Sequence, residues 1–283
     1  MERKETIKTC LITGSNSGIG KATAIEMAQR GYNILMLCRD SEKSRNAQAE
    51  IEKVSNEIMV DLVYVDFSSL KSIENAASEI TQKYSSIDVL INNAGVVKRK
   101  LTTSEDGLEM NLAVNFLAPF YLTNLLLPLL KQSDSARIIN VTSELYKSGK
   151  IDMENDYSKT KYQGNKVYAN AKLWVVLFSY QLAEILTEEK ITVNAVHPGV
   201  IQTDAFRDYP TWYNKMLGLF LSKPEAGAKP LVYLATSDEV KDLSGKYFSK
   251  SKLSETAKNT QDRKQWKAVW NRASELTGLK NQI

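Results

Sequence analysis

The stretch Thr9-Cys10-Leu11-Ile12-Thr13-Gly14-Ser15-Asn16-Ser17-Gly18-Ile19-Gly20 decides the fold class of this sequence. A short apolar run gives way to a polar turn with three glycines, and a helix-forming segment follows over 21–30. This order predicts a strand, a tight turn and a helix. Glycines let the backbone approach a ligand closely, and the first N–H groups of the helix point into the turn. A three-glycine pattern alone is weak, but its position between a buried strand and a helix favours a site for the pyrophosphate of a dinucleotide.

Composition favours one large α/β domain and excludes several other classes of protein. The 283 residues include 37 basic and 33 acidic side chains, and a net charge of +4 is too small to indicate nucleic-acid binding. Two cysteines and one histidine are too few to build a metal site. We recognise no signal peptide, and the longest apolar runs, 125–130 and 173–178, are far shorter than the ~20 residues that span a membrane. The sequence therefore predicts a cytosolic protein without a transmembrane segment.

Strands and helices alternate along the whole chain, and no linker or repeat divides it. We expect strands at 10–12, 33–38, 58–65, 88–92, 137–142, 191–197 and 246–248. We expect helices at 21–30, 41–55, 69–84, 105–131 with a bend at Pro119, 168–187, from 223 onward, and 261–276. The alternation predicts a Rossmann-type doubly wound parallel sheet of about seven strands, with helices on both faces. Residues 1–283 then form a single domain, in which about 7–145 bind the cofactor, 146–240 hold the catalytic helix and a substrate lid, and 241–283 add a strand and a helix.

The carboxyl ends of parallel strands carry the ligands in such a sheet, and small or polar residues follow several of the predicted strands. The glycine turn should contact the cofactor through Gly14, Ser15, Asn16, Ser17, Gly18, Ile19 and Gly20. Asp66 and Phe67 follow the third strand and should contact the adenine edge, although Asp66 as a helix cap is an almost equal alternative. The fourth strand ends with little side-chain bulk beside a flat cofactor, at Asn92, Ala94 and Gly95.

The end of the second strand bears on the choice between NAD and NADP. An acidic residue there would bind the ribose hydroxyl of NAD, whereas a basic residue suits the 2′-phosphate of NADP. Arg39 can form a charge-assisted pair with that phosphate. The neighbouring Asp40 argues mildly against NADP(H), because a carboxylate repels a phosphate. NADP(H) is therefore the preferred cofactor and NAD(H) is left open, with a solvated surface arginine as the alternative interpretation.

A tyrosine made acidic by a nearby lysine can supply the proton that follows hydride transfer to a carbonyl. Tyrosine and lysine four residues apart share one helix face, and the ammonium lowers a phenol pKa that is normally about 10. The chain has three such pairs, Tyr157/Lys161, Tyr162/Lys166 and Tyr168/Lys172. An apolar stripe that buries a helix follows only Tyr168, so we predict Tyr168 and Lys172 as the catalytic pair. The other two pairs fit a solvated segment.

Two further polar positions complete the predicted catalytic group. Thr142 and Ser143 end the fifth strand, and either hydroxyl could donate a hydrogen bond to the substrate oxygen. Asn115 lies within a predicted helix, where asparagine is a poor helix former, and could hold a water that relays protons to Lys172.

Together these residues resemble the short-chain dehydrogenase/reductase family over nearly the whole chain. The family motifs correspond here to Thr13–Gly20, Asn92–Gly95, Asn115, Ser143, Tyr168/Lys172 and Pro198-Gly199. The resemblance assigns the catalytic serine to Ser143 rather than Thr142. It adds to the cofactor site the catalytic pair Tyr168 and Lys172 and the residues Pro198, Gly199, Val200 and Thr203. Ala171 departs from the family pattern, since many members have serine before the lysine.

Finer features resemble the branch of retinol dehydrogenases and related WW-domain oxidoreductases. They are segment 66–73, the long insert between Ser143 and Tyr168, segment 197–203 and the ending 275–279. That branch typically uses NADP(H), which agrees with Arg39. We expect no N-terminal membrane anchor of the kind that many animal retinol enzymes carry. His197, a lone histidine before Pro198-Gly199, fits a structural role better than a catalytic one.

The sequence thus predicts an NADP(H)-dependent oxidoreductase that interconverts a carbonyl and an alcohol on a small molecule. Segment 205–221 is rich in aromatic and aliphatic residues, so we expect a hydrophobic aldehyde or ketone such as a retinoid-, steroid- or lipid-like compound. Packing of that segment onto the core or a second subunit is the alternative, and a homo-oligomer and weak membrane-surface contact are left open. A non-catalytic dinucleotide sensor is the competing class of function, and a sugar-nucleotide epimerase would need a larger carboxyl-terminal domain.

Overall fold

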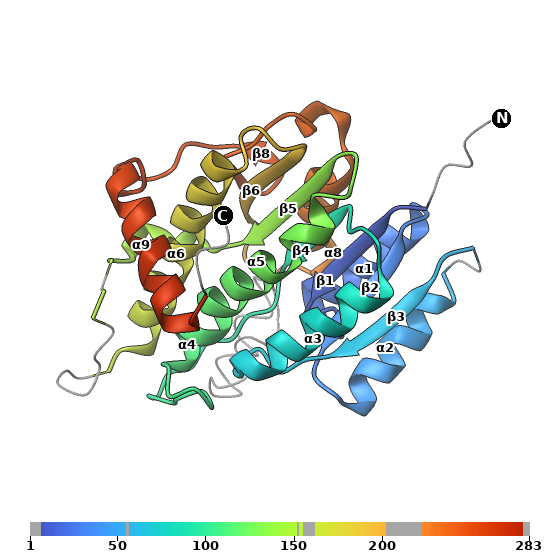
Figure 1. Cartoon of the computed structure of the whole chain (residues 1–283), viewed down its shortest axis with the longest axis horizontal. Coiled ribbons are helices and arrows are strands. Elements are labelled where there is room, and N and C mark those ends of the chain that lie inside the picture. Colours follow the sequence, from blue (N-terminus) through green and yellow to red (C-terminus); the bar gives the residue numbers. More distant parts are fainter. Residues whose placement is uncertain (1–6, 55–56, 152, 155–161, 202–221, 280–283) are drawn as a thin grey trace.

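The computed structural model describes residues 7–54, 57–151, 153–154, 162–201 and 222–279 (Figure 1). Its strands are β1 (Thr9–Thr13), β2 (Asn33–Cys38), β3 (Val60–Tyr64), β4 (Val89–Asn92), β5 (Ala136–Val141), β6 (Ile191–His197), β7 (Lys246–Ser249) and β8 (Lys252–Leu253). They form one sheet in the order β3-β2-β1-β4-β5-β6-β7-β8, parallel except for the antiparallel pair of β7 and β8. The predicted doubly wound sheet is confirmed, with β8 as an added edge strand.

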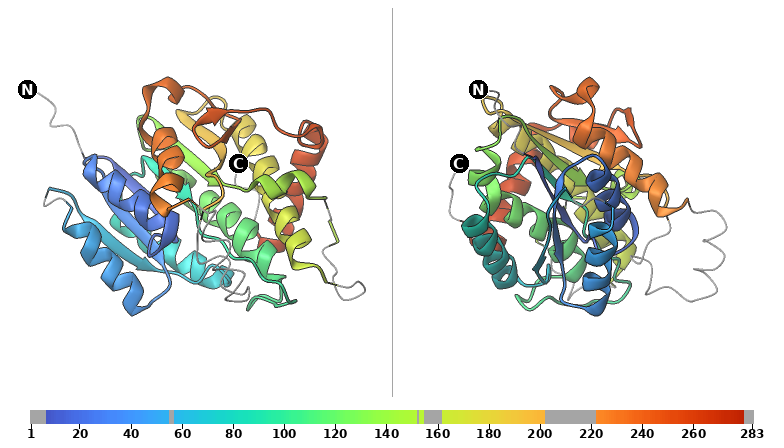
Figure 2. Two further views of the ribbon diagram at one scale, coloured as in Figure 1. Left: turned by 180° about the vertical axis from the view of Figure 1, so that it is seen from behind. Right: turned by 90° about the vertical axis from the view of Figure 1, so that its right-hand side faces the viewer.

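Helices cover both faces of this sheet (Figure 2). Alternate side chains of the buried strands enter different cores, so Leu11 packs on one face and Ile12 on the other. The first face carries α3 (Leu70–Lys83), α5 (Ala118–Leu130), α6 (Gly164–Ile185) and α9 (Arg263–Thr277). The opposite face carries α1 (Gly18–Gln29), α2 (Glu42–Glu52) and α8 (Pro224–Thr236). The strand order reverses between β1 and β4, and in such sheets ligands bind at that reversal.

The helix predicted over 105–131 differs from the observed one at its start and in its middle. A turn around Ser104, whose hydroxyl accepts the N–H groups of Asp106 and Leu108, delays the helix until Met110. The helix then runs as α4 (Met110–Leu112), a π-helical turn η1 (Ala113–Leu117) and α5. The π turn directly precedes Pro119, which lacks the N–H that would bond the Asn115 carbonyl.

Two other helices differ slightly from prediction. The helix expected at 168–187 is observed at Gly164–Ile185. Its first turn could not be predicted, because residues 164–167 carry no apolar stripe. The final helix begins after the cap Asp262 and ends at Gly278, whose φ of +66° is left-handed. Within the described chain, one helical stretch, Met110–Leu130, is long and apolar enough to cross a membrane, and 78% of its most apolar window is buried inside the fold.

Candidate active site

A cavity of ≈ 980 Å³ opens at the carboxyl ends of the parallel strands. It brings together residues from the turns after β1, β2, β3, β4, β5 and β6. Most predicted site residues line it: Gly14, Asn16, Ser17, Gly18, Ile19, Gly20, Arg39, Asp66, Phe67, Ala94, Gly95, Asn115, Ser143, Tyr168, Lys172, Pro198, Gly199 and Val200.

Two predicted cofactor contacts lie behind the cavity instead. The Ser15 hydroxyl donates to the Ile12 carbonyl at 3.0 Å and supports the turn from within. The Asn92 amide donates to Thr123 and Asn140 at 2.9 and 2.8 Å and ties β4 to its neighbours. Neither residue is among those that line the cavity, so a cofactor contact of Ser15 or Asn92 stays a prediction. Thr203 lies outside the described residues.

The turn after β1 forms a cradle in which three positions, 14, 18 and 20, require glycine. Gly14 and Gly18 have φ values of +68° and +52°. A Cβ on Gly20 would lie 2.4 Å from the Gly14 carbonyl oxygen and 2.5 Å from the Asn93 amide nitrogen. The cap residue of α1, Ser17, makes no side-chain hydrogen bond to the helix, so the first N–H groups of α1 stay available for an anion. This cradle fits the pyrophosphate of a dinucleotide.

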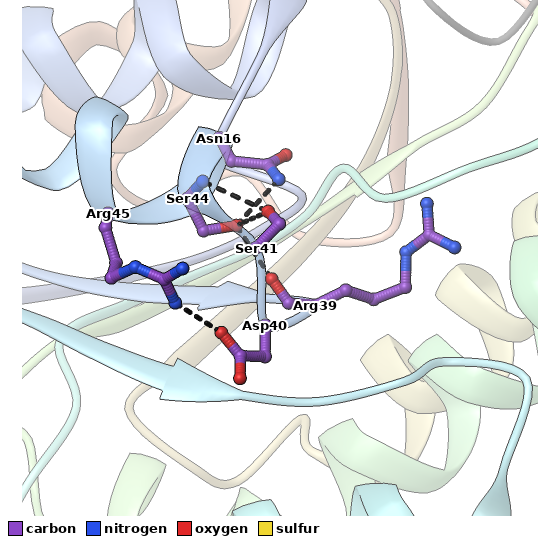
Figure 3. A network of polar contacts seen from close by, with 6 residues as sticks. All are labelled: Asn16, Arg39, Asp40, Ser41, Ser44 and Arg45. Atoms are coloured by element: carbon purple, nitrogen blue, oxygen red, sulfur yellow. Dashed lines mark hydrogen bonds and ion pairs between the residues drawn. The ribbon is translucent and has the colours of Figure 1, made fainter.

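Arg39 and Asp40 point in different directions at the end of β2 (Figure 3). The Asp40 carboxylate pairs with Arg45 at 2.6 Å, away from the Arg39 guanidinium. The Arg39 backbone is fixed by the Ser44 hydroxyl, which donates to its carbonyl at 2.7 Å and accepts the Asn16 amide at 2.9 Å. The exposed Arg39 side chain lines the cavity. The Asp40 carboxylate, which would disfavour a phosphate nearby, is largely neutralised by its ion pair with Arg45.

Tyr168 and Lys172 face the cavity from α6. The Lys172 ammonium lies 5.8 Å from the centroid of the Tyr168 ring and donates to the Val141 carbonyl at 2.9 Å. Only 4% of Lys172 is exposed, and this burial lowers the pKa of its ammonium to about 8. The pair therefore combines the half-buried phenol of Tyr168 with a lysine that loses its proton near pH 8.

The structure separates the candidate hydroxyls that the sequence left open. The Thr142 hydroxyl is buried and donates to the Lys172 carbonyl at 2.8 Å, so it fixes α6 to β5. Ser143 is half-buried and its oxygen accepts the Leu145 N–H at 3.3 Å, which leaves its hydroxyl proton for a ligand. Tyr162 donates its proton to Glu109 at 2.6 Å, and Tyr157 with Lys161 lies outside the described residues.

Asn115 holds the segment after β4 with its side chain. Its amide oxygen accepts the Val96 N–H at 3.0 Å, and its amide nitrogen donates to the Val96 carbonyl at 2.8 Å. Gly95 leaves room for this contact, since a Cβ there would lie 2.7 Å from the Asn115 oxygen. A water held by the Asn115 side chain is therefore a poor description. The backbone carbonyl of Asn115 is the better candidate for binding that water, because Pro119 has no N–H to donate to it.

Among the lining residues, Lys43 and Glu144 escaped the sequence prediction, and His197 is predicted there only in a structural role. Lys43 adds a second basic residue near Arg39, and Glu144 and His197 add polar groups near Ser143. His197 is 7% exposed, and its Nδ1 has no hydrogen-bond partner among the described residues. Burial lowers the pKa of His197. The basic pair Arg39 and Lys43 could have been found from its spacing, whereas nothing in the sequence pattern singles out Glu144.

Comparison with known proteins identifies the family. The short chain dehydrogenase family model matches residues 8–214, which include the glycine turn, Ser143, Tyr168 and Lys172. The chain belongs to the short-chain dehydrogenase family. It is therefore an oxidoreductase that binds a nicotinamide dinucleotide and interconverts alcohols and carbonyls of small molecules, and the competing sensor interpretation is set aside.

The relatives of this short-chain dehydrogenase confirm the predicted branch. The chain is 40% identical to retinol dehydrogenase 13 of Homo sapiens, an alignment that covers 96% of this chain and 85% of the relative. It is 36% identical to retinol dehydrogenase 14 of Mus musculus, covering 96% and 86%. Among solved structures, an uncharacterised protein from Mycobacterium paratuberculosis superposes with a TM-score of 0.80 at 27% identity over 98% and 95% of the two chains. YwfH, an NADPH dependent reductase of bacilysin biosynthesis, shares the fold with a TM-score of 0.71 at 20% identity, covering 86% of this chain and 96% of YwfH.

Proposed function

We propose that this short-chain dehydrogenase uses NADP(H) to interconvert hydrophobic aldehydes or ketones, such as retinoid-, steroid- or lipid-like compounds, with their alcohols. One observation carries the proposal: Tyr168, Lys172 and Ser143 line the same cavity as the uncapped start of α1 and Arg39. The cofactor, when bound, supplies or accepts the hydride. The cavity reaches from its predicted phosphate contacts to the predicted proton donor, as such a reaction requires.

Each catalytic residue has a role that its contacts permit. Tyr168 gives the proton to the oxygen of the reduced carbonyl, and Ser143 donates a hydrogen bond to the same oxygen. Lys172, charged below its pKa of about 8, stabilises the phenolate that Tyr168 becomes. Asn115 holds Val96 beside the reacting centre and offers its carbonyl to a water that returns a proton through Lys172. These roles can be tested one residue at a time.

The preference for NADP(H) rests on Arg39. A hydrogen bond from its guanidinium to the 2′-phosphate is worth about 1.5–3 kcal/mol, which is roughly a ten- to hundredfold change in affinity. Arg39→Ala should weaken NADPH binding by that factor and leave NADH binding nearly unchanged, as measured by fluorescence titration. Arg30→Ala is the matched control, because Arg30 is an exposed arginine that pairs with Glu26 on α1 and does not line the cavity. Equal losses for both cofactors would contradict the 2′-phosphate role.

The expected substrate class rests on the apolar part of the cavity wall. Its described members come from the turns after β4, β5 and β6 and from α4 and η1: Val96, Val97, Met110, Val114, Leu145, Val200 and Ile201. Two of them, Leu145 and Val200, remain 48% and 64% exposed and so have apolar surface that a substrate could bury. The names of the relatives, retinol dehydrogenases, point to the same class.

The chain length of the substrate should therefore control the rate. We expect kcat/KM to rise along a series of straight-chain aldehydes, because each buried CH₂ contributes about 0.8 kcal/mol. Trp212→Ala should flatten the rise, although Trp212 and the rest of segment 205–221 lie outside the described residues. A flat series in the wild type, or better activity on sugars and small hydroxy acids, would contradict the substrate class.

The proposal also includes a cytosolic location, which cell fractionation would test.

A further inference from the structure

Segment 96–98 is held by two asparagines that act together like a neighbouring strand. Asn115 bonds both backbone groups of Val96, and Asn111 bonds both backbone groups of Lys98, accepting its N–H at 2.7 Å and donating to its carbonyl at 3.0 Å. Four helical residues rise about 6 Å, and two extended residues span about 6.6 Å, so the two spacings match. The segment is thereby fixed along the start of the α4–η1 helix.

A buried carboxylate extends this arrangement. Glu109 is 6% exposed and accepts three hydrogen bonds: from the Leu112 N–H at 2.7 Å, from the Asn111 amide at 3.0 Å and from the Tyr162 hydroxyl at 2.6 Å. The Tyr162 oxygen also accepts the Asn111 amide at 2.8 Å. A buried charge with three donors is stable, and the loss of one donor leaves it partly unpaired.

Tyr162 connects this cluster to the helix that carries Tyr168. It lies two residues before the first residue of α6, Gly164. Gly164 packs directly on segment 96–98, since a Cβ there would lie 2.0 Å from the Lys98 carbonyl oxygen. Val96, Val97 and Lys98 line the cavity, and so does Tyr168, about one turn into α6. The Tyr162–Glu109 bond therefore joins the cavity wall to the helix that delivers the phenol.

We propose that Tyr162, through its bond to Glu109, is a positioning residue that fixes the first turn of α6 against segment 96–98 and so sets the place of Tyr168 in the cavity. The inference rests on the proposed catalytic role of Tyr168. It gives the second of the three tyrosine–lysine pairs a role other than proton transfer to substrate. The Tyr162 hydroxyl has two acceptors inside the fold, the Glu109 carboxylate at 2.6 Å and, more weakly, the Lys98 carbonyl at 3.3 Å.

Tyr162→Phe removes the bond and keeps the ring, and Tyr84→Phe is a matched control. The Tyr84 hydroxyl also donates to a carboxylate, that of Asp61, but Tyr84 directly follows α3 and Asp61 lies on β3, the strand at the far edge of the sheet. Tyr162→Phe should lower kcat/KM about tenfold, mainly through kcat, because small displacements of a catalytic group are costly. Its NADPH affinity should stay within about twofold of the wild type, and Tyr84→Phe should leave both quantities unchanged.

A double-mutant cycle with Glu109→Gln tests whether the bond itself is responsible. If it is, the Tyr162→Phe/Glu109→Gln double variant should be little worse than either single variant. Effects on kcat/KM that multiply independently would overturn the proposal, as would a Tyr162→Phe enzyme as active as Tyr84→Phe. Loss of all turnover in Tyr162→Phe while Tyr168→Phe stays active would make Tyr162 the proton donor and would also overturn it.

Hydrogen exchange supplies a readout that does not depend on turnover. In Tyr162→Phe, peptides covering 96–99 and 164–168 should exchange faster than in the wild type, and in Tyr84→Phe they should not. Unchanged exchange in both variants would contradict the anchor. A wild-type enzyme that reduces no carbonyl would contradict the proposed function instead, and the exchange measurement would still decide whether Tyr162 holds α6 to segment 96–98.

Discussion

Tyr168→Phe should lower kcat for carbonyl reduction about a thousandfold, because it removes the phenolic hydroxyl, the only acidic group of the side chain, while keeping its ring. Tyr168 lines the cavity, and the Lys172 ammonium lies 5.8 Å from the centroid of its ring, which phenylalanine keeps. NADPH affinity should stay close to that of the wild type, since the glycine cradle and Arg39 lie on other elements. Steady-state kinetics with a hydrophobic aldehyde and a separate NADPH titration measure the two effects.

The other tyrosine–lysine pairs provide the controls for this prediction. Tyr157→Phe should be nearly as active as the wild type, and Tyr162→Phe should lose about tenfold, far less than Tyr168→Phe. If Tyr157→Phe is the variant that loses turnover, the assignment of Tyr168 is wrong. If all three variants keep their activity, proton transfer does not depend on a tyrosine of this region.

Local signals explain why the fold and most of the site could be predicted from sequence. The glycine turn, the buried strands and the polar residues after them are each encoded within a few neighbouring residues. Alternation of strands and helices then determines the sheet, and the sheet brings the strand ends together. Gly14, Asp66, Ser143 and Lys172 therefore share one cavity although they are far apart in sequence.

The parts that could not be predicted depend on contacts between distant residues. The π turn at Ala113–Leu117 combines Pro119 with the bonds that Asn115 makes to Val96, 19 positions earlier. The role of Tyr162 depends on Glu109, 53 positions away. Ser15 and Asn92 stand at the predicted strand ends, but only the direction of their side chains decides that they support the turns from behind. Helical spacing and strand alternation carry no such information.

Lys172→Met should abolish most turnover and make the cofactor-free protein more stable. Turnover should fall about a hundredfold or more, because the phenolate of Tyr168 loses its stabilising charge. Burial lowers the pKa of Lys172 from 10.5 to about 8, so keeping its charge in the fold at pH 7 costs about 3 kcal/mol. Methionine removes that cost but leaves the Val141 carbonyl without its donor, which costs about 1 kcal/mol. The net gain of about 2 kcal/mol should raise Tm by about 3–4 °C in a thermal melt, since a chain of 283 residues unfolds with an entropy of about 0.6 kcal/mol/K.

The pH dependence of this gain distinguishes the charge from simple packing. Below about pH 8, Lys172 is protonated in both the folded and the unfolded protein, and the folded wild type bears the full cost of the buried charge. Between about pH 8 and 10.5 the unfolded chain binds the proton and the folded chain does not, so wild-type stability rises with pH relative to the variant. The stability advantage of Lys172→Met should therefore shrink across this range and be lost near its upper end.

Lys166→Met is the control, because Lys166 is exposed on the first turn of the same helix, and it should change Tm little at any pH. Two results would show that the buried ammonium does not destabilise the folded wild type. One is a stability difference for Lys172→Met that stays constant from pH 8 to 10, and the other is a variant less stable than the wild type at pH 7.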